Sequence, residues 1–385
     1  MNRFEHKDPV PIKEAEGNPD PDRLEPIDID ELIRQREQEF RVVLKVKTPV
    51  ATYILIAINV MVFALIYFIS MQTGNSYSRL LHTFGAKVNT RILAGEYWRL
   101  ITPIFLHASV MHLAVNCYSL YALGVTAEKL FGRFRFLTVY LVAGVLGNIF
   151  SLMFSPNPGV GASGAIFGLL GTMLYFGLEK PALFRASFGR SILFSLLINL
   201  AYGFSNAGID NFAHIGGLIG GFLASGIVAK TEKKRWYFNR YLYIAVTLLL
   251  IVSGLAYGFN SKQNRIALKT EELVTLDEAQ EWSQLEAKAE ELLELGLKNE
   301  ELKVSILWTL AKAEAMTQKY DEAVLHAEEL SLLDPQNGHY MLGILYFDMQ
   351  QFNRSKEELL KSKNAGADYE QIDQILSDIE AITNQ

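Results

Sequence analysis

Cysteine is almost absent from this sequence of 385 residues. The single cysteine, Cys117, lies inside an apolar run. One thiol cannot form a disulfide within the chain, and it cannot build a cysteine-based metal site. The compartment therefore has to be inferred from topology, and we expect neither a metal ion nor a cofactor.

Acidic residues are scarce in the middle of the chain. Residues 51–261 contain five Asp and Glu against fifteen Lys and Arg, whereas residues 262–385 contain twenty-five against twelve. The middle block instead holds seven apolar runs, most of them near the 20 residues that an α-helix needs to cross a bilayer, with the run at 191–204 the shortest. We predict an all-α polytopic membrane bundle with spans at 51–70, 111–127, 134–154, 162–178, 191–204, 212–229 and 241–259.

The distribution of basic residues predicts the orientation of this bundle. The segments before the first predicted span and after the second, fourth and sixth are basic, whereas residues 155–161 and 205–211 contain no Lys or Arg. Basic loops favour the cytoplasmic side, so we expect the N-terminus inside and the C-terminus outside. The loop at 71–102 is an exception, because it carries four basic residues on the predicted outer side. About fifty polar residues precede the first span, so we do not expect a cleaved signal peptide.

The segment 161–168, Gly-Ala-Ser-Gly-Ala-Ile-Phe-Gly, places one hydroxyl at the start of an apolar helix. Free backbone N–H groups in a first helical turn can hold a developing oxyanion beside Ser163. Gly164, Gly168 and Gly171 fall on one helix face, where another helix can approach closely. The alternative is a small-residue packing seam, common in membrane helices, with an incidental serine.

Two further spans carry polar residues near their starts. His112 and Asn116 are four residues apart, so they share one helix face. Ionisable groups at membrane depth are costly and usually functional, although a structural hydrogen-bonded pair between helices is the alternative. In the sixth span, His214 shares a face with Gly217 and Gly221, so this helix can pack closely against another glycine-lined helix.

The second, fourth and sixth spans run in the same direction, so these polar residues lie near the same surface of the bilayer. Ser163 and His214 would then provide a nucleophile and a general base. His112 and Asn116 could donate hydrogen bonds to an oxyanion beside the Ser163 N–H. A triad would need a carboxylate beside the histidine. No carboxylate lies at this depth in the fourth span, and near the sixth span there is only Asp210, in the preceding loop. We therefore expect a Ser-His dyad and no triad.

Two other polar features allow two interpretations each. Glu128 shares a helix face with Gly124 and Gly132, and its carboxylate either lies in the interface or bonds a neighbouring helix. Trp98 and Arg99 either anchor the loop at headgroup depth, which both residue types favour, or belong to a structured loop that braces the site.

Together these residues resemble the intramembrane serine proteases of the rhomboid family. The matching residues follow the family's order and spacing through most of 94–221: Trp98, Arg99, His107, His112, Asn116, Gly124, Glu128, Gly132, Gly161, Ser163, Gly164, His214, Gly217 and Gly221. The resemblance implies a helical bundle around a water-filled cavity. It also implies Ser163 as nucleophile and His214 as base, with His112 and Asn116 in the oxyanion hole.

The same resemblance implies substrates that are themselves membrane helices, cut near the outer surface. Phe167 departs from the pattern, because many bacterial members have tyrosine at this position. A phenyl ring can stack on His214 but offers no hydroxyl.

Residues 262–385 are acidic and show a helical repeat. The first unit, closed by Pro335, resembles a tetratricopeptide repeat, and the second follows at a spacing of 32; their patterned residues are Trp308, Leu310, Ala313, Tyr320, Ala323 and Ala327, then Tyr340, Leu342, Leu345, Phe352, Ser355 and Leu359. Such stacks present concave surfaces for peptides or proteins. Partner binding is one interpretation, and a spacer is the other.

These features divide the chain into a cytoplasmic tail (1–50), a catalytic membrane domain (51–230), a basic loop with a seventh span that we interpret as a tether (231–261), and an extracytoplasmic repeat domain (262–385). We hypothesise an intramembrane serine endopeptidase of a bacterial plasma membrane. Its expected partners are the bilayer, transmembrane protein substrates, and proteins or peptides bound by the repeats, without nucleic acid. The alternatives are a catalytically inactive rhomboid-like scaffold and a transporter, for which the sequence offers no inverted repeat.

Overall fold

The computed structural model describes residues 48–187, 189–206, 208–229 and 235–383, and most of these residues are helical. The predicted all-α class is confirmed. The predicted cytoplasmic tail up to residue 47 lies outside the described residues, as do Lys230, Lys233 and Lys234 of the basic loop.

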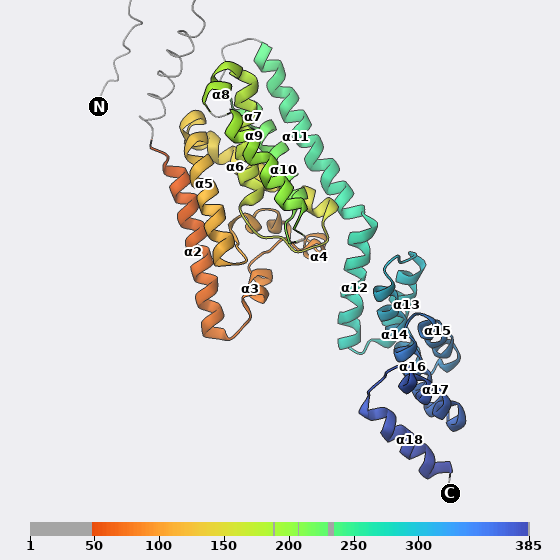
Figure 1. Cartoon of the computed structure of the whole chain (residues 1–385). Coiled ribbons are helices and arrows are strands. Elements are labelled where there is room, and N and C mark those ends of the chain that lie inside the picture. The colour runs from red at the N-terminus through yellow and green to blue at the C-terminus, as the bar shows by residue number, and fades with distance from the viewer. Residues whose placement is uncertain (1–47, 188, 207, 230–234, 384–385) are drawn as a thin grey trace, which may run out of the picture.

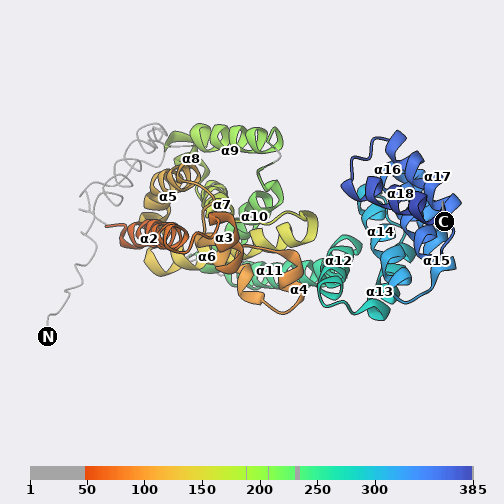
Figure 2. The same cartoon turned by 90° about the horizontal axis from the view of Figure 1, so that it is seen from below.

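All seven predicted spans are helices. Five are long and apolar enough to cross a membrane: α2 (Val50–Thr73), α5 (Val110–Phe131), α6 (Arg133–Phe154), α10 (Asn211–Val228) and the Asn239–Asn260 part of α11 (Arg235–Asn260). Two shorter apolar helices, α7 (Ser163–Glu179) and α9 (Gly189–Phe204), form the fourth and fifth predicted spans. The protein is therefore a multi-pass membrane protein. A short helix, α8 (Pro181–Ser187), leads into α9, which lies along one edge of the bundle (Figure 2).

The helix ends follow from the local sequence. Pro49 precedes α2, and Gly74 ends it in the left-handed conformation with φ of 68°, which glycine adopts without steric cost. The Ser109 hydroxyl accepts the His112 N–H at 3.2 Å and caps α5. Gly132, with φ of 83°, is the single residue between α5 and α6.

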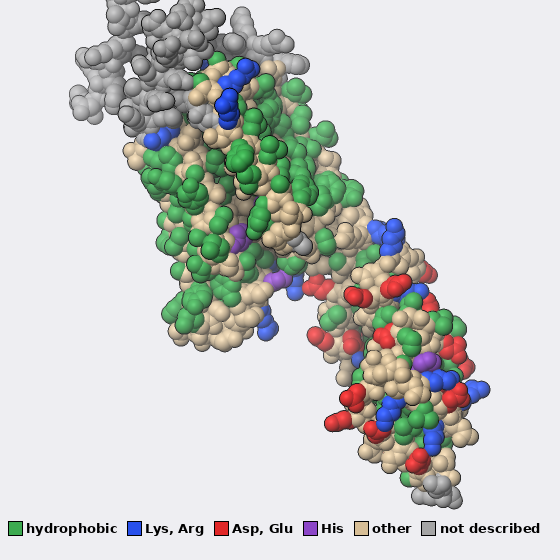
Figure 3. All heavy atoms as spheres, viewed as in Figure 1, with side chains coloured by type: hydrophobic (Ala, Val, Ile, Leu, Met, Phe, Trp, Pro, Cys, Tyr) green, Lys and Arg blue, Asp and Glu red, His purple; other side chains and the backbone are tan. Residues whose placement is uncertain are grey.

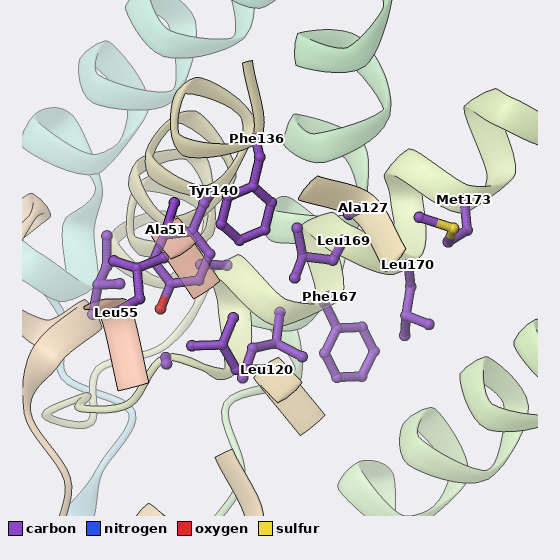
Figure 4. Packing of buried hydrophobic residues seen from close by; sticks show 14 of the residues in the cluster. Ala51, Leu55, Leu120, Ala127, Phe136, Tyr140, Phe167, Leu169, Leu170 and Met173 are labelled. Carbon is purple, nitrogen blue, oxygen red and sulfur yellow. The ribbon is translucent and has the colours of Figure 1, made fainter. Parts of the chain in front are cut away.

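Side chains of α2, α5, α6 and α7 form the main buried cluster, which includes Leu55, Leu120, Tyr140 and Leu169 (Figure 4). The outside of the bundle is apolar as well, and many large hydrophobic side chains such as Leu65 and Leu248 are more than half exposed. Figure 3 shows this apolar surface over the bundle, with the Asp and Glu side chains gathered on the C-terminal helices and some Lys and Arg side chains at the ends of the bundle. A surface of this kind is compatible with lipid, where no water competes for hydrogen bonds.

Helices α7 and α10 pack against each other through glycine. A Cβ on Gly217 would lie 1.9 Å from the Gly164 carbonyl oxygen, and one on Gly221 would lie 1.9 Å from the Gly168 carbonyl oxygen. No larger residue fits at this separation. The prediction that glycine allows these two helices to approach closely is confirmed.

Short helices fill the long segment between α2 and α5: α3 (Tyr77–Thr83), α4 (Asn89–Leu93) and the 3-10 helices η1 (Tyr97–Leu100) and η2 (Thr102–Phe105). Figure 1 shows α3 and α4 at one end of the bundle. At the other end of the bundle, Glu128 is buried, and its carboxylate accepts the backbone N–H groups of Ala51 and Thr52 at 2.9 and 2.7 Å. Of the two interpretations of Glu128, the bond to a neighbouring helix is confirmed.

Helix α11 packs directly on the bundle. A Cβ on Gly254 would lie 2.6 Å from Ile149 of α6, and one on Gly258 would lie 2.8 Å from Leu152. The interpretation of this helix as a simple tether therefore missed a packed contact. One residue, Ser261, separates α11 from α12 (Lys262–Glu278).

The C-terminal part continues as a series of consecutive helices that pack on their neighbours in sequence: α13 (Trp282–Glu294), α14 (Glu300–Met316), α15 (Tyr320–Leu333), α16 (Pro335–Asp348), α17 (Phe352–Asn364) and α18 (Glu370–Thr383). Figure 1 shows α12 and these helices at the end of the bundle where α3 and α4 lie, and Figure 2 shows them to one side of it.

Candidate active site

Ser163 and His214 each lie at the beginning of a glycine-lined helix. Ser163 is the first residue of α7, and Gly161, with φ of 130°, turns the chain into that helix. His214 lies in the first turn of α10, which Asp210 caps by accepting the Ala213 N–H at 3.0 Å. The His214 Nε2 is 3.0 Å from the Ser163 Oγ, which is hydrogen-bonding distance.

The ring of Phe167 fixes the plane of the His214 imidazole. Phe167 is one helical turn after Ser163, and its ring stacks on the imidazole with centroids 4.1 Å apart and planes 8° from parallel. Both side chains are buried. The predicted stacking of Phe167 on His214 is present without any hydroxyl at this position.

His112 and Asn116 extend the cluster from α5. A Cβ on Gly161 would lie 2.8 Å from the His112 Nε2 and 3.8 Å from the Ser163 Oγ, so the imidazole and the hydroxyl flank the same glycine. The Ala108 N–H donates to the His112 Nδ1 at 3.4 Å, which leaves Nε2 as the protonated nitrogen. The buried Asn116 amide donates one of its two hydrogens to the His112 carbonyl at 2.9 Å.

His107 supports His112 from the loop before α5. Its ring is fully buried and meets the His112 ring edge-on, with centroids 5.3 Å apart. Its carbonyl accepts the Tyr77 hydroxyl at 2.9 Å. Burial, reinforced by the neighbouring His112, lowers the pKa of His107 to about 4, so this ring is neutral at pH 7.

Asp210 is the carboxylate nearest in sequence to His214, but its side-chain hydrogen bonds are made to groups other than the His214 ring. One oxygen caps α10, and the other accepts the Ser151 hydroxyl. Among the described residues, no hydrogen-bond partner meets the buried His214 Nδ1. The arrangement is consistent with a Ser-His pair.

Trp98 and Arg99 lie outside this cluster and differ from each other. Trp98 is 55% exposed, as an interfacial anchor would be. Arg99 is buried, and its guanidinium donates to the carbonyls of His82 and Ala86 at 2.7 and 2.9 Å. The Arg99 side chain therefore braces the loop, whereas the Trp98 side chain is exposed.

Lys87 is a buried residue near the site that sequence reasoning did not single out. The only sequence feature that could have drawn attention to Lys87 is its place in the loop at 71–102, which carries basic residues on the predicted outer side. Three of the four basic side chains in this loop have structural partners. Arg99 and Lys87 donate to backbone carbonyls, and Arg91 pairs with Glu271 at 3.3 Å.

Known proteins with similar sequences share this part of the chain. The rhomboid domain matches residues 94–231. The rhomboid protease GluP of Bacillus subtilis is 38% identical over 304 residues, which cover 77% of this chain and 58% of GluP. The putative rhomboid protease YdcA of the same organism is 39% identical over 150 residues, 38% of this chain and 75% of YdcA.

The similarity extends beyond bacteria. RHOMBOID-like protein 6 of Arabidopsis thaliana, a protein named as mitochondrial, is 35% identical over 202 residues, which cover 47% of this chain and 66% of the relative. The chain thus spans 58% of the length of GluP and three quarters of YdcA. With the membrane bundle and the shared rhomboid domain, these matches show that the chain belongs to the rhomboid family.

Proposed function

We propose that the protein is an intramembrane serine endopeptidase that hydrolyses peptide bonds in or next to the transmembrane helices of membrane-protein substrates. The observation that carries the proposal is the 3.0 Å separation of the Ser163 Oγ and the His214 Nε2 at the starts of two closely packed helices. A hydroxyl is a weak nucleophile until a neighbouring base accepts its proton. Membership of a family that includes named proteases adds support.

In the proposed mechanism, His214 Nε2 accepts the Ser163 proton while the Oγ attacks the substrate carbonyl carbon. The Ser163 N–H, the His112 Nε2–H and the remaining Asn116 amide hydrogen hold the negative oxygen that forms. His214 then donates its proton to the leaving amine. Water, activated by the same imidazole, hydrolyses the acyl-enzyme and restores the serine.

The substrate must expose its backbone before this reaction. Peptide bonds within a helix are shielded by i to i−4 hydrogen bonds, which are most persistent in hydrocarbon where no water competes. We therefore propose that the site accepts segments that fray near the membrane surface.

We further propose that the C-terminal helices are tetratricopeptide-like repeats that bind substrate or partner proteins. Residues 32 apart have equivalent burial in the α14–α15 and α16–α17 pairs: Leu310 and Leu342, Ala323 and Ser355, and Ala327 and Leu359 are all buried. Such equivalence is expected of repeated helix pairs. A spacer would show the same burial, so partner binding needs its own test, a pull-down that compares the full chain with a variant lacking residues 279–385.

The proposed location is a bacterial plasma membrane, with residues 1–50 cytoplasmic, 51–230 forming the catalytic domain, 231–261 containing the last span, and 262–385 extracytoplasmic. The location of the relatives GluP and YdcA in a bacterium supports the choice of membrane.

The direct test is substitution of the two reacting residues. Ser163→Ala and His214→Ala should each lower cleavage of a reporter membrane helix by at least about 1,000-fold, because either loss disables the nucleophile. The control is Ser253→Ala, which removes an exposed serine of α11 that bonds only its own helix. A fluorophosphonate probe should label the unmodified protein and the control, but not the Ser163 variant. Full cleavage by Ser163→Ala would refute the proposal, and helix binding without labelling would favour an inactive scaffold.

A further inference from the structure

The segment that leads into Ser163 is held by the distant loop between α2 and α5. This segment, residues 155–162, connects α6 to α7. Lys87 pairs with Gly159 through both backbone hydrogen bonds, each 2.9 Å long. The position of the segment therefore depends on Lys87 as well as on the helices at its ends.

The Lys87 side chain also bonds this segment, in addition to the Lys87 backbone. The side chain has no exposed surface, and its Nζ donates to the carbonyl oxygens of Ser155 and Asn157, each at 2.9 Å. A buried ammonium group is costly unless it is paired and hydrogen-bonded. Burial lowers the pKa of Lys87 to about 8, and the charge of Asp210 opposes this shift.

The segment held by Lys87 also lies beside the start of the other reacting helix. Asp210 caps α10 one turn before His214. The position of a Cβ on Gly159 lies 3.7 Å from the Lys87 side chain and 3.9 Å from the Asp210 Oδ2. Gly159 of this segment thus lies next to both Lys87 and the cap that precedes His214.

Two buried amides extend this arrangement to the C-terminal part of the chain. The Asn89 Nδ2 donates to the Ser155 carbonyl at 3.0 Å and to the Asn264 Oδ1, in the first turn of α12, at 2.7 Å. The Asn264 Nδ2 donates to the carbonyls of Leu152 and Gly258 at 2.9 and 2.8 Å. These bonds join α4, α6, α11 and α12 where the 155–162 segment begins.

We propose that Lys87, Asn89 and Asn264, which we name the loop clamp, are positioning residues for Ser163, and that the loop clamp links the reacting serine to the first helix of the C-terminal part. The loop clamp rests on the proposed protease function. None of its three residues touches the Ser163 or His214 side chain in the described contacts. They act through the backbone that carries the serine.

The first test is Lys87→Met, which keeps most of the length of the side chain and removes its two hydrogen bonds to the segment. We expect kcat for a reporter membrane helix to fall by about 10- to 100-fold, because a misplacement of about 1 Å in a reacting group has an effect of this size. KM should stay within about two-fold, since the substrate contacts are unchanged. The control is Arg79→Met, in which an exposed basic side chain of the same loop is replaced. All rates are normalised to the fraction folded, from thermal unfolding in detergent.

The second variant, Asn264→Ala, tests the loop clamp from α12 and decides the case where Lys87→Met does not fold. We expect kcat and the rate of fluorophosphonate labelling of Ser163 to fall together by about 3- to 10-fold, on the same positional argument. Folded variants with unchanged kcat would overturn the loop clamp and leave the protease proposal intact. An unmodified protein that neither cleaves nor is labelled would refute the protease proposal, and the loop clamp with it.

Discussion

At the scale of single residues, the contact between Phe167 and His214 shows what an aromatic ring contributes without a hydroxyl. Parallel stacking at 4.1 Å restricts rotation of the imidazole, whose Nε2 must stay within 3.0 Å of the Ser163 Oγ. Orientation of a reacting group is a large part of the rate advantage of a preformed site. The ring is therefore the important feature of this position.

This argument predicts the effect of two substitutions. Phe167→Ala removes the stacked ring, and we expect kcat to fall by about ten-fold because the imidazole gains rotational freedom. Phe167→Tyr keeps the ring and should leave kcat within about two-fold of the unmodified protein. Reporter cleavage in detergent micelles measures both. Equal kcat in all three proteins would show that stacking has no role.

Glu128 illustrates a structural carboxylate within the membrane domain. It accepts the N–H groups of Ala51 and Thr52 and the Thr52 hydroxyl, so it satisfies the first turn of α2, which would otherwise be buried without partners. We expect Glu128→Ala to lower the free energy of unfolding by about 3 kcal/mol, since each buried unsatisfied group costs about 1–3 kcal/mol.

Unfolding in detergent, followed by circular dichroism, measures this loss. The matched control is Glu179→Ala, which removes an exposed carboxylate at the end of α7. If the two variants were equally stable, the hydrogen bonds to α2 would contribute nothing to folding.

The proximity of Ser163 and His214 could be predicted from the sequence, because both follow a loop at the same end of helices that run in the same direction. The role of Lys87 could not. Its side chain bonds carbonyls 68 and 70 residues away, and local patterns carry no information about contacts at that separation. Hydropathy also gives no means of distinguishing a buried lysine from one that faces headgroups.

At the scale of helices, the close approach of α7 and α10 determines the geometry of the site. The backbone of α10 lies so near α7 that a Cβ on Gly217 would overlap the Gly164 carbonyl oxygen. We expect Gly217→Ala to push the helices apart, to lower the free energy of unfolding by about 1–3 kcal/mol, and to lower kcat by at least about ten-fold.

The comparison for this prediction is Gly159→Ala, where the nearest atoms lie at 3.7 Å and a methyl group fits. Its kcat should remain near that of the unmodified protein. Reporter cleavage and detergent unfolding are measured on both variants, and a Gly217→Ala variant as active as Gly159→Ala would show that the helix separation is not critical.

Helix positions were well predicted where hydropathy alone determines them, as for α6, expected at 134–154 and observed at Arg133–Phe154. The short helices between α2 and α5 were not predicted. They depend on bonds such as those from Arg99 to the carbonyls of His82 and Ala86, and these form only when the segment is folded. Tertiary contacts therefore decide this region, and the repeat pattern of residues 262–385 likewise indicated helices without indicating where they attach.

At the scale of the whole molecule, the orientation in the membrane is a prediction from the distribution of basic residues. An alkaline phosphatase fused after Gln385 should be active, because that enzyme folds only outside the cytoplasm, and a fusion truncated after Ala229 should be inactive. Phosphatase activity in intact bacterial cells measures both. The opposite result for the pair would reverse the predicted orientation.

The junction at Ser261 has a consequence for how such proteins can be rebuilt. A flexible linker would allow the C-terminal helices to take many positions relative to the bundle. Here only one residue separates α11 from α12, and Asn264 bonds the Leu152 carbonyl of α6. Helix α12 is therefore a rigid strut. A protein bound by those helices would be held at a fixed distance from the bilayer and in a fixed orientation. A chimera that exchanges this module should therefore be joined after Glu278, so that the strut stays with the membrane domain.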